Sequence, residues 1–431
     1  MNDGSIRWLK DRAYRIFTLG ASNRVVGVFY SIMVAGILLS IAAFFITKGN
    51  SLGDMLFYDR HDYFMDYFNS IYYSLHDPYF EYDVIYPALT TAGYYAIGAV
   101  LEAVQVPFTD AITIRESPLG MLSYLLITAV ALFVLYKALN KNKEESRKET
   151  AIFFILSLLS FPMLFSIDRG NSVLIAVIFS LLFVAGYDSD DKKTRYLSYV
   201  FLGIAAGIKI FPFLFGLLVV RRFVESRKSE DLKEMAICAV IGAVIFLAPF
   251  ALFEGSFMAI LDNAFGYSRG LYPVGLGDIS SLIQTTAIII GYENYSTLAG
   301  AGTAVSLIFM LSVAIYVLFY KNAEKWELIC LLSAAQILFS GVAYPYVLLY
   351  MLIPAWYFIS SRPVMNLKNA IYAILLAAVL MPFPGFIGWE HMSYGRDMMV
   401  WAVVIIILVS AAVRLYDQNY TDDKMVPDQR N

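Results

Sequence analysis

The stretch VVGVFYSIMVAGILLSIAAFFI, from Val25 to Ile46, contains no charged residue. A helix that rises about 1.5 Å per residue needs roughly 20 apolar residues to cross a hydrocarbon layer about 30 Å thick. The run from Val25 to Ile46 meets that length, and MLSYLLITAVALFVLY, from Met121 to Tyr136, comes close to it. Both stretches therefore predict membrane helices.

Similar apolar runs continue along the whole chain. Of its 431 residues 59% are hydrophobic and 16% are charged, and the mean hydropathy is +0.64, whereas an average soluble domain carries about 25% charged residues. We expect a single integral-membrane domain over residues 1–431, all-α and polytopic, with about 10–13 transmembrane or re-entrant helices. The apolar segments are 25–47, 86–104, 118–137, 150–167, 172–187, 196–220, 234–253, 279–291, 298–320, 326–341, 343–360, 368–384 and 398–415.

The basic residues predict the orientation of these helices, because cytoplasmic loops carry an excess of Lys and Arg. We expect the N-terminus (1–24), the tail (416–431) and the short basic loops in the cytoplasm. This assignment puts 25 of the 32 basic residues on the cytoplasmic side. The outer face of the cell membrane then receives the loops 48–85, 254–278 and 382–397. The remaining basic residues are Lys48, Arg60, Arg115, Arg169, Lys209, Arg269 and Arg396.

Two apolar segments do not fit a simple crossing. Residues 86–104 must return to the outside or lie in the interface, and residues 196–220 have basic clusters at both ends. The second segment divides into two arms of about 12 residues, each too short to span, around Gly207, Lys209 and Pro212. We expect a re-entrant hairpin with Lys209 near its tip; the alternative is one kinked span.

The first outer loop, residues 48–85, combines carboxylates with many aromatic rings. Met65, Phe68 and Tyr72 recur at helical spacing, which predicts an interfacial helix lying on the membrane. An interfacial role alone does not require so many acids, whereas a sugar site uses carboxylates for hydroxyl groups and one of them as a general base. The acids are Asp54, Asp59, Asp62, Asp66, Asp77, Glu81 and Asp83.

Other function classes find little support in the sequence. Cys238 and Cys330 lie inside apolar runs, and there is no G-x-S-x-G, P-loop, H-E-x-x-H or C-x-x-C motif. His61 and His76 each precede an aspartate, but adjacent residues rarely point at one metal ion. We expect no metal, no cofactor and no nucleic-acid partner, and no soluble domain is present to bind a nucleotide sugar.

The sequence MDYFNSIYYSLHDPYFEYDVIYPALT, from Met65, resembles the first outer loop of GT-C glycosyltransferases, specifically the polyprenol-phosphate-mannose-dependent glycosyltransferase family 87. Family members show an acid followed by an aromatic or apolar residue, a Pro-Tyr turn, and a Y-P-P-L opening to the next helix. Here Tyr67 follows the acid, and Ala88 stands where a second proline is usual.

Two further stretches match the same family in order. SIDRGNSVLIAVIFSLLF, from Ser166, is similar to its R-G-N segment, and GIAAGIKIFPFLFGLLVVRRF, from Gly203, is similar to its segment with a lysine before a proline. The three matches span roughly residues 60–225. The resemblance implies a GT-C-like bundle that transfers a hexose, mannose in the family, from a polyprenyl-phosphate donor to a lipid- or glycan-linked acceptor hydroxyl, with inversion.

The resemblance and the charge pattern together give the candidate site. Asp66 is the expected general base, with Asp62 one turn away as its rival. Arg169 and Lys209 are expected to bind the donor phosphate; the alternative for each is a side chain that snorkels to a membrane surface. The candidates for binding sugar or acceptor are Asn171, Tyr79, Tyr86, His76, Arg269, Glu390 and His391. For Arg269, Glu390 and His391 the alternative is an ordinary residue of a surface loop.

Two alternatives from other classes stay open at this point. A transporter or flippase of lipid-linked saccharides would show internal repeats and ionisable residues near the midplane, and here Lys209 is the only strong charge inside an apolar run. A membrane polysaccharide ligase or polymerase would carry its large outer loop late in the chain rather than early.

Overall fold

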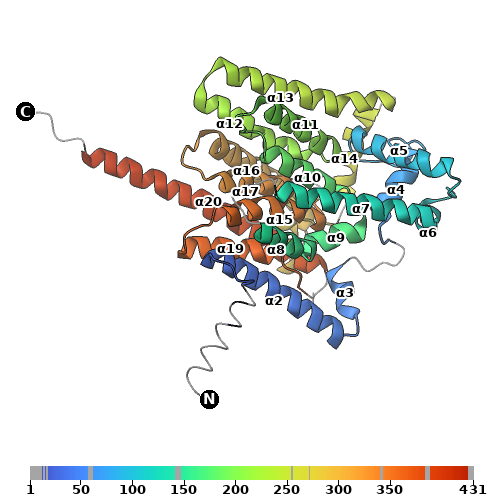
Figure 1. Ribbon diagram of the computed structural model, residues 1–431, viewed down its shortest axis with the longest axis horizontal. Helices are drawn as coiled ribbons and strands as arrows, with labels where there is room; N and C mark the ends of the chain where they lie inside the picture. Colours follow the sequence, from blue (N-terminus) through green and yellow to red (C-terminus); the bar gives the residue numbers. More distant parts are fainter. Residues whose placement is uncertain are drawn as a thin grey trace, which may run out of the picture.

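The computed structural model describes residues 12, 15, 18–56, 62–140, 147–253, 256–270, 272–339, 343–383 and 389–425, without the side chains of 54–55, 265, 267–270, 389–393 and 417–425. Within these ranges the chain is all-helical and contains no strand. Figure 1 shows most of the helices running in the same general direction, which is the arrangement of a helical bundle.

Five helical stretches among the described residues are long and apolar enough to cross a membrane. This agrees with the prediction of a polytopic all-α membrane protein, which is therefore confirmed. Large apolar side chains such as Leu125, Val244 and Ile308 remain exposed on these helices, as expected where lipid replaces water. The stretches are Arg24–Ile46 (α2), Pro118–Leu139 (α7), Ser229–Leu252 (α13 and η2), Tyr295–Phe319 (η3 and α16) and Tyr394–Tyr416 within α20, Trp389–Met425.

The other apolar segments form shorter or broken helices. The predicted segment 150–167 is split into two helices bent by 56°, because Pro162 in the first turn of the second helix lacks the N–H that a continuous helix requires. Each of the thirteen predicted segments coincides with helical structure. The short and broken helices are α8 (Arg147–Leu158), α9 (Phe161–Arg169), α10 (Val173–Val184), α15 (Ile279–Ile289), α17 (Lys325–Leu338), η4 (Pro345–Met351), α18 (Leu352–Ser360) and α19 (Leu367–Leu380).

Residues 192–226 fold back on themselves. Helix α11 (Lys192–Ile208) ends at Lys209, which is in an extended conformation, and the chain returns through η1 (Phe211–Gly216) and α12 (Leu217–Ser226). Arg195 near the start of α11 and Arg222 on α12 both contact the carboxylate of Glu234 on α13. The two ends of the segment therefore lie together, and Lys209 lies at the turn between them. Re-entry into a membrane remains a prediction.

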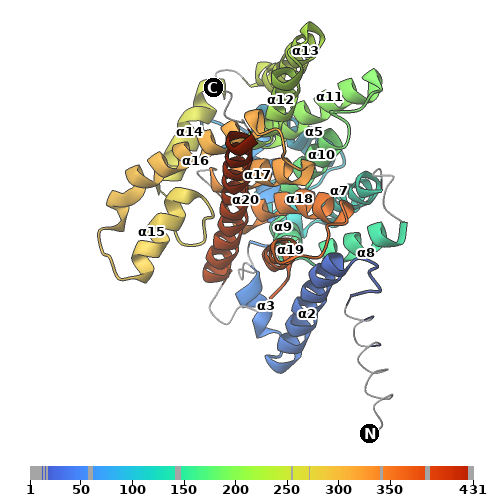
Figure 2. The same cartoon turned by 90° about the vertical axis from the view of Figure 1, so that its left-hand side faces the viewer.

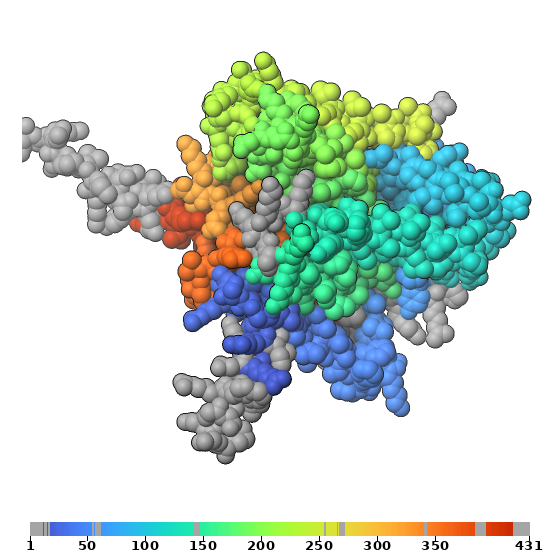
Figure 3. Space-filling view, in the orientation of Figure 1, coloured from blue at the N-terminus to red at the C-terminus, as the bar shows by residue number. Residues whose placement is uncertain are grey.

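The first outer loop gathers at one end of the bundle, to the right in Figure 1. Its helix α4 (Met65–Ser74) buries Met65, Phe68 and Ile71 against α5 (Ala88–Ala103), α6 (Ala111–Glu116) and α7, while Tyr72 is half-buried. The loop is helical as predicted, but the apolar face of α4 is covered by protein. In Figure 3 the segments that contain α5 and α7, in cyan to teal, cover that end of the visible face. The loop also contains α3 (Asn50–Met55).

Helix α17 forms the centre of the core, as Figure 2 shows. Every residue from Trp326 to Leu338 is buried. Helices α16 (Ala299–Phe319), α18 and α20 pack around it, together with η4 and η1. Polar side chains on α17 are consequently enclosed by protein rather than exposed at the surface.

Candidate active site

A cavity of about 590 Å³ lies where α4, the turn after α9, the tip at Lys209, α17 and η4 meet. Its wall combines charged, amide and aromatic side chains drawn from segments far apart in the sequence. This composition is typical of a ligand site, in which a few polar groups are placed within a mostly apolar enclosure. The charged and polar or aromatic side chains in the wall include Asp62, Asp66, Asn69, Tyr73, Tyr82, Tyr86, Arg169, Lys209, Gln336, Tyr344, Tyr346 and Tyr350.

Asp66, in the first turn of α4, is held by two residues from the far end of α9. Arg169 Nη2 donates a hydrogen bond to Asp66 Oδ1 at 2.7 Å, and Asn171 Nδ2 donates to Asp66 Oδ2 at 2.6 Å. Arg169 Nη1 also donates to Oδ2 of Asp62. Both oxygens of Asp66 are thus oriented, and each keeps a further lone pair for another donor.

Gly170 makes this double contact possible. Its φ of +68° lies in the left-handed region, which favours glycine. A Cβ at this position would lie 2.9 Å from the backbone oxygen of Phe64 and 3.0 Å from Cβ of Tyr67. The backbone of the segment before α4 therefore approaches Gly170 closely, and the N–H of Phe64 donates to the carbonyl oxygen of Asp168 at 2.8 Å.

Asn171 links this turn to the next helix. Its Oδ1 accepts a hydrogen bond from the N–H of Val173 at 3.0 Å, while its Nδ2 also lies 3.3 Å from the hydroxyl of Tyr86. The backbone contact fixes the side-chain amide at the start of α10, with the N–H groups directed to Asp66 and Tyr86. The R-G-N sequence thus supplies one donor on each side of a glycine turn.

Lys209 enters the cavity from the tip of the α11–α12 hairpin. Its Nζ lies 4.0 Å from the centre of the Tyr86 ring and 5.6 Å from that of Tyr346. Lys209 has no ion pair or hydrogen bond with any of the described residues. The three donors of its ammonium group are therefore available to an anion.

Thr90 on α5 secures the backbone that precedes Lys209. Its Oγ1 lies 3.1 Å from the carbonyl oxygen of Gly207 and 3.0 Å from that of Ile208. These are the carbonyl groups at the end of α11, which have no partner within the helix. Helix α5 thus fixes the position from which Lys209 projects.

The cavity wall contains two acidic and two basic residues. The acids are Asp62 and Asp66, and the bases are Arg169 and Lys209. Burial raises the pKa of Tyr73, and the charges of Asp62 and Asp66 raise it further. Its phenol stays protonated at neutral pH and offers a hydrogen-bond donor in the cavity wall.

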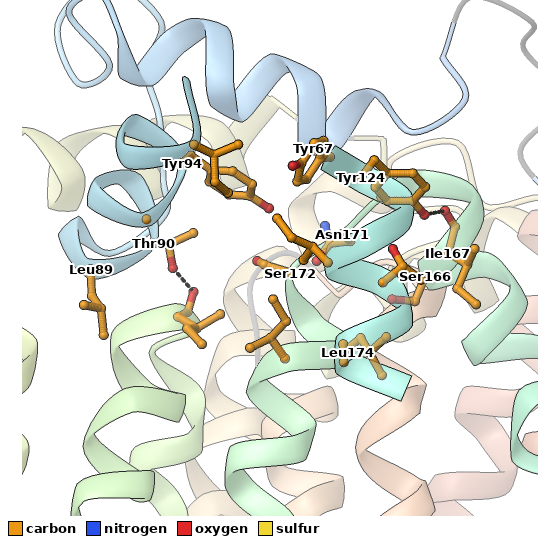
Figure 4. A pocket seen from close by; sticks show the side chains of 18 of the residues that line it. Tyr67, Leu89, Thr90, Tyr94, Tyr124, Ser166, Ile167, Asn171, Ser172 and Leu174 are labelled. Carbon is orange, nitrogen blue, oxygen red and sulfur yellow. Dashed lines mark hydrogen bonds between the residues drawn. The ribbon is translucent and has the colours of Figure 1, made fainter. Parts of the chain in front are cut away.

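A second pocket, of about 390 Å³, adjoins the site (Figure 4). Aliphatic side chains of α5, α7, α10 and α11, such as Ile127 and Ile204, form most of its wall. Asn171 lines this pocket and not the larger cavity, and its hydrogen bond to Asp66 connects the two. In Figure 4 the rings of Tyr67, Tyr94 and Tyr124 lie along one side of the pocket.

Not every candidate from the sequence lies in the cavity wall. Tyr79 is buried beneath the loop, where its hydroxyl donates to the Tyr86 carbonyl oxygen at 3.1 Å and lies 2.9 Å from Thr91 Oγ1. The ring of His76 packs on Tyr72, and its Nδ1 lies 2.8 Å from the Tyr72 carbonyl oxygen. Neither residue lines the cavity, and both have local partners. The side chains of Arg269, Glu390 and His391 lie outside the described residues.

The sequence analysis missed Gln336, on α17, and Tyr350, on η4, both of which line the cavity. The available signal was a polar Gln336 within the apolar run LICLLSAAQIL, since polar side chains inside membrane segments are commonly functional. Tyr350 carries no such signal, because tyrosine is frequent in membrane proteins. Among the described residues no group of three or more His, Cys, Asp or Glu side chains is arranged to hold a metal ion.

Comparison with known proteins identifies the family. A sequence profile of glycosyltransferase family 87 matches residues 103–345, more than half of the chain, and no curated protein matches the chain. The matched range contains Arg169, Asn171 and Lys209, and Asp66 precedes it. The resemblance inferred from the three motifs is thus confirmed, and it favours sugar transfer over the transporter and ligase alternatives. The chain belongs to glycosyltransferase family 87 and is a multi-pass membrane glycosyltransferase.

Proposed function

We propose that the protein transfers a hexose, mannose by family resemblance, from a polyprenyl-phosphate donor to an acceptor hydroxyl on the outer face of the cell membrane. One observation carries this proposal: a carboxylate oriented by two donors and a lysine without a carboxylate partner share one cavity. A base for the attacking hydroxyl and a cation for the leaving phosphate are the two groups that such a transfer needs.

The proposed reaction is a single displacement. The acceptor oxygen attacks the anomeric carbon of the hexose, its proton passes to Asp66, and the bond between that carbon and the phosphate oxygen breaks. The products are the glycosylated acceptor and polyprenyl phosphate, and the proton later leaves Asp66 for water. One displacement inverts the anomeric centre, so a β-linked donor gives an α-linked product.

Lys209 has the larger part in stabilising the leaving group. The donor phosphate is a diester with one negative charge, and cleavage leaves a monoester that develops a second. A cation placed in advance beside that oxygen lowers the barrier, because its attraction grows as the charge develops. Arg169 is already engaged with Asp62 and Asp66. Its main role in the proposal is therefore to orient the base.

Two features support a lipid-linked donor over a soluble one. The apolar pocket beside Asn171 offers space for a hydrocarbon chain close to the proposed reaction centre. The surrounding helices expose apolar side chains of the kind that face lipid. A donor anchored by its chain would arrive from within the bilayer, with its sugar phosphate at the level of Asp66 and Lys209.

The experiment supplies purified protein, in lipid nanodiscs, with labelled polyprenyl-phosphate mannose and a lipid extract as acceptor. The proposal predicts label transfer to an acceptor, release of polyprenyl phosphate, and an α-linkage in the product by NMR. A nucleotide-linked mannose offered instead should give no transfer. A folded preparation that transfers mannose from the nucleotide donor, or from neither donor, contradicts the proposal.

A further inference from the structure

The cavity wall contributed by α17 and η4 contains two polar groups without a partner in the described part of the chain. Gln336 is only 1% exposed; its Nε2 donates to the carbonyl oxygen of Leu332 at 3.3 Å, and its Oε1 has no hydrogen-bond partner among the described residues. Tyr350 is 3% exposed, and its hydroxyl likewise has no partner within the described part of the chain. Both residues line the cavity that contains Asp66.

These unpaired groups are costly in an otherwise apolar helix. A buried polar group without a partner destabilises a fold by about 1–3 kcal/mol, and most such groups in proteins are paired. Leucine or phenylalanine would fill the two positions without that cost. Ser333, also on α17, has no partner among the described residues either, but it does not line this cavity. The position of Gln336 and Tyr350 in the wall therefore suggests that a ligand completes their hydrogen bonding.

The chemistry of the two groups selects the kind of ligand. The Gln336 carbonyl oxygen is an acceptor and requires a donor, whereas a tyrosine hydroxyl both donates and accepts. A phosphate oxygen offers no proton to an amide oxygen, and the cation suited to it, Lys209, comes from another element. A sugar hydroxyl matches both groups. Tyr344 and Tyr346 line the same cavity and supply aromatic surface for a sugar ring.

We propose that Gln336 and Tyr350 form the subsite that recognises ring hydroxyl groups of the transferred hexose, and that they determine which hexose is accepted. This inference rests on the proposed function. Asp66 and Lys209 act on the bonds that form and break. Gln336 and Tyr350 act on the hydroxyl groups that distinguish one hexose from another.

The test compares the complete hexose donor with a series of donors that each lack one hydroxyl, measured as kcat/KM. The wild type should prefer the complete donor over at least one deoxy donor by about tenfold to a hundredfold. The missing hydroxyl of the deoxy donor leaves a buried polar group of the protein unpaired. Gln336→Met keeps the length and volume of the side chain but removes both polar atoms, and it should abolish most of this preference. Tyr350→Phe removes a single oxygen and should abolish the preference for the donor hydroxyl that Tyr350 recognises. It also provides the answer if Gln336→Met does not fold.

Ser333→Ala is the matched control, since Ser333 is buried and unpaired on the same helix but lies outside the cavity wall. It should keep the wild-type preference at every hydroxyl. Wild-type preferences in both Gln336→Met and Tyr350→Phe would overturn the subsite and leave the proposed function standing. A folded wild type that transfers no hexose would overturn the proposed function, and the subsite with it.

Discussion

The two ends of the α11–α12 hairpin carry similar charges in different surroundings. At the base, Arg195, Arg222 and Tyr199 all contact the carboxylate of Glu234, which is only 2% exposed. At the tip, Lys209 and Arg169 meet Asp62 and Asp66 around a cavity of about 590 Å³.

The difference between these ends is in which groups remain free. The carboxylate at the base is saturated by protein donors, so nothing there is left for a substrate. At the tip Lys209 has no acceptor among the described residues, and Asp66 keeps lone pairs toward the cavity. A cluster of opposite charges therefore becomes a candidate active site only where space and an unsatisfied group coincide. Substitutions at the tip should change catalysis, and substitutions at the base should change stability.

The largest effect is expected for Asp66→Asn. The amide has nearly the shape of the carboxylate but cannot take a proton from the acceptor, so the rate should fall by about 10²–10⁴-fold, the usual contribution of a general base. Initial transfer rates in nanodiscs measure the loss, and thermal unfolding should show a folded protein.

Asp62→Asn is the matched control for the choice of base, because Asp62 shares Arg169 with Asp66. A smaller loss than for Asp66→Asn is expected. If Asp62→Asn lost more activity than Asp66→Asn, the roles of the two acids would have to be exchanged.

At the base, Glu234→Ala should lower stability rather than the rate of folded protein. Removing one partner of a buried ion pair leaves uncompensated charge, here on Arg195, and commonly costs about 3–5 kcal/mol. Arg222 keeps its ion pair with Asp231. Thermal unfolding in the same nanodiscs would measure this. Glu230→Ala is the control, because its ion pair with Lys192 is exposed and should contribute little to stability. A Glu234→Ala protein that is as stable as the wild type but impaired in transfer would contradict the claim that the base contributes to stability and the tip to catalysis.

Lys209→Met should lower kcat by about 10²–10³-fold, the range found for removing one preplaced electrostatic donor. Methionine keeps an unbranched apolar side chain, one atom shorter than lysine, but loses the charge. Lys209→Arg should recover part of the activity, since a guanidinium also binds phosphate. Full activity in Lys209→Met would assign the phosphate to another residue.

The smallest effect is expected for Thr90→Val, which keeps the shape of the side chain but removes the hydroxyl that contacts the carbonyl oxygens of Gly207 and Ile208. A lost hydrogen bond is worth about 0.5–1.5 kcal/mol, so kcat should fall severalfold while unfolding changes little. Thr128→Val provides a comparison, because Thr128 lines the same apolar pocket as Thr90 but belongs to α7. An equal loss in both variants would contradict a specific role for Thr90.

The helices were predictable because their signal is local. An apolar run by itself indicates a helix that is buried in protein or lipid, and each predicted segment coincides with helical structure. The breaks were harder to place. The bend before Phe161 follows from Pro162. The return of the chain after Lys209 is visible only in tertiary contacts, such as those of Arg195 and Arg222 with Glu234.

The site was predictable to the extent that its residues are unusual in their local sequence. Asp66, Arg169 and Lys209 are charged groups in or beside apolar segments, and the structure brings them together. Tyr79 resembles the cavity tyrosines in composition but is buried beneath the loop, because sequence does not show which way a ring faces. Gln336 and Tyr350 line the same cavity as Asp66 of α4, although they lie more than 260 positions away in the sequence. Only the tertiary fold brings them to one cavity.

A structure with a donor analogue tests the central claim most directly. The measurement is a cryo-EM structure of the wild type bound to a polyprenyl-phosphonate hexose, whose C–P bond prevents transfer. The account predicts phosphonate oxygens within hydrogen-bond distance of Lys209 Nζ, the hexose inside the cavity, and Asp66 on the side of the anomeric carbon opposite the phosphonate. A hexose bound outside this cavity, or a phosphonate away from Lys209, would contradict it.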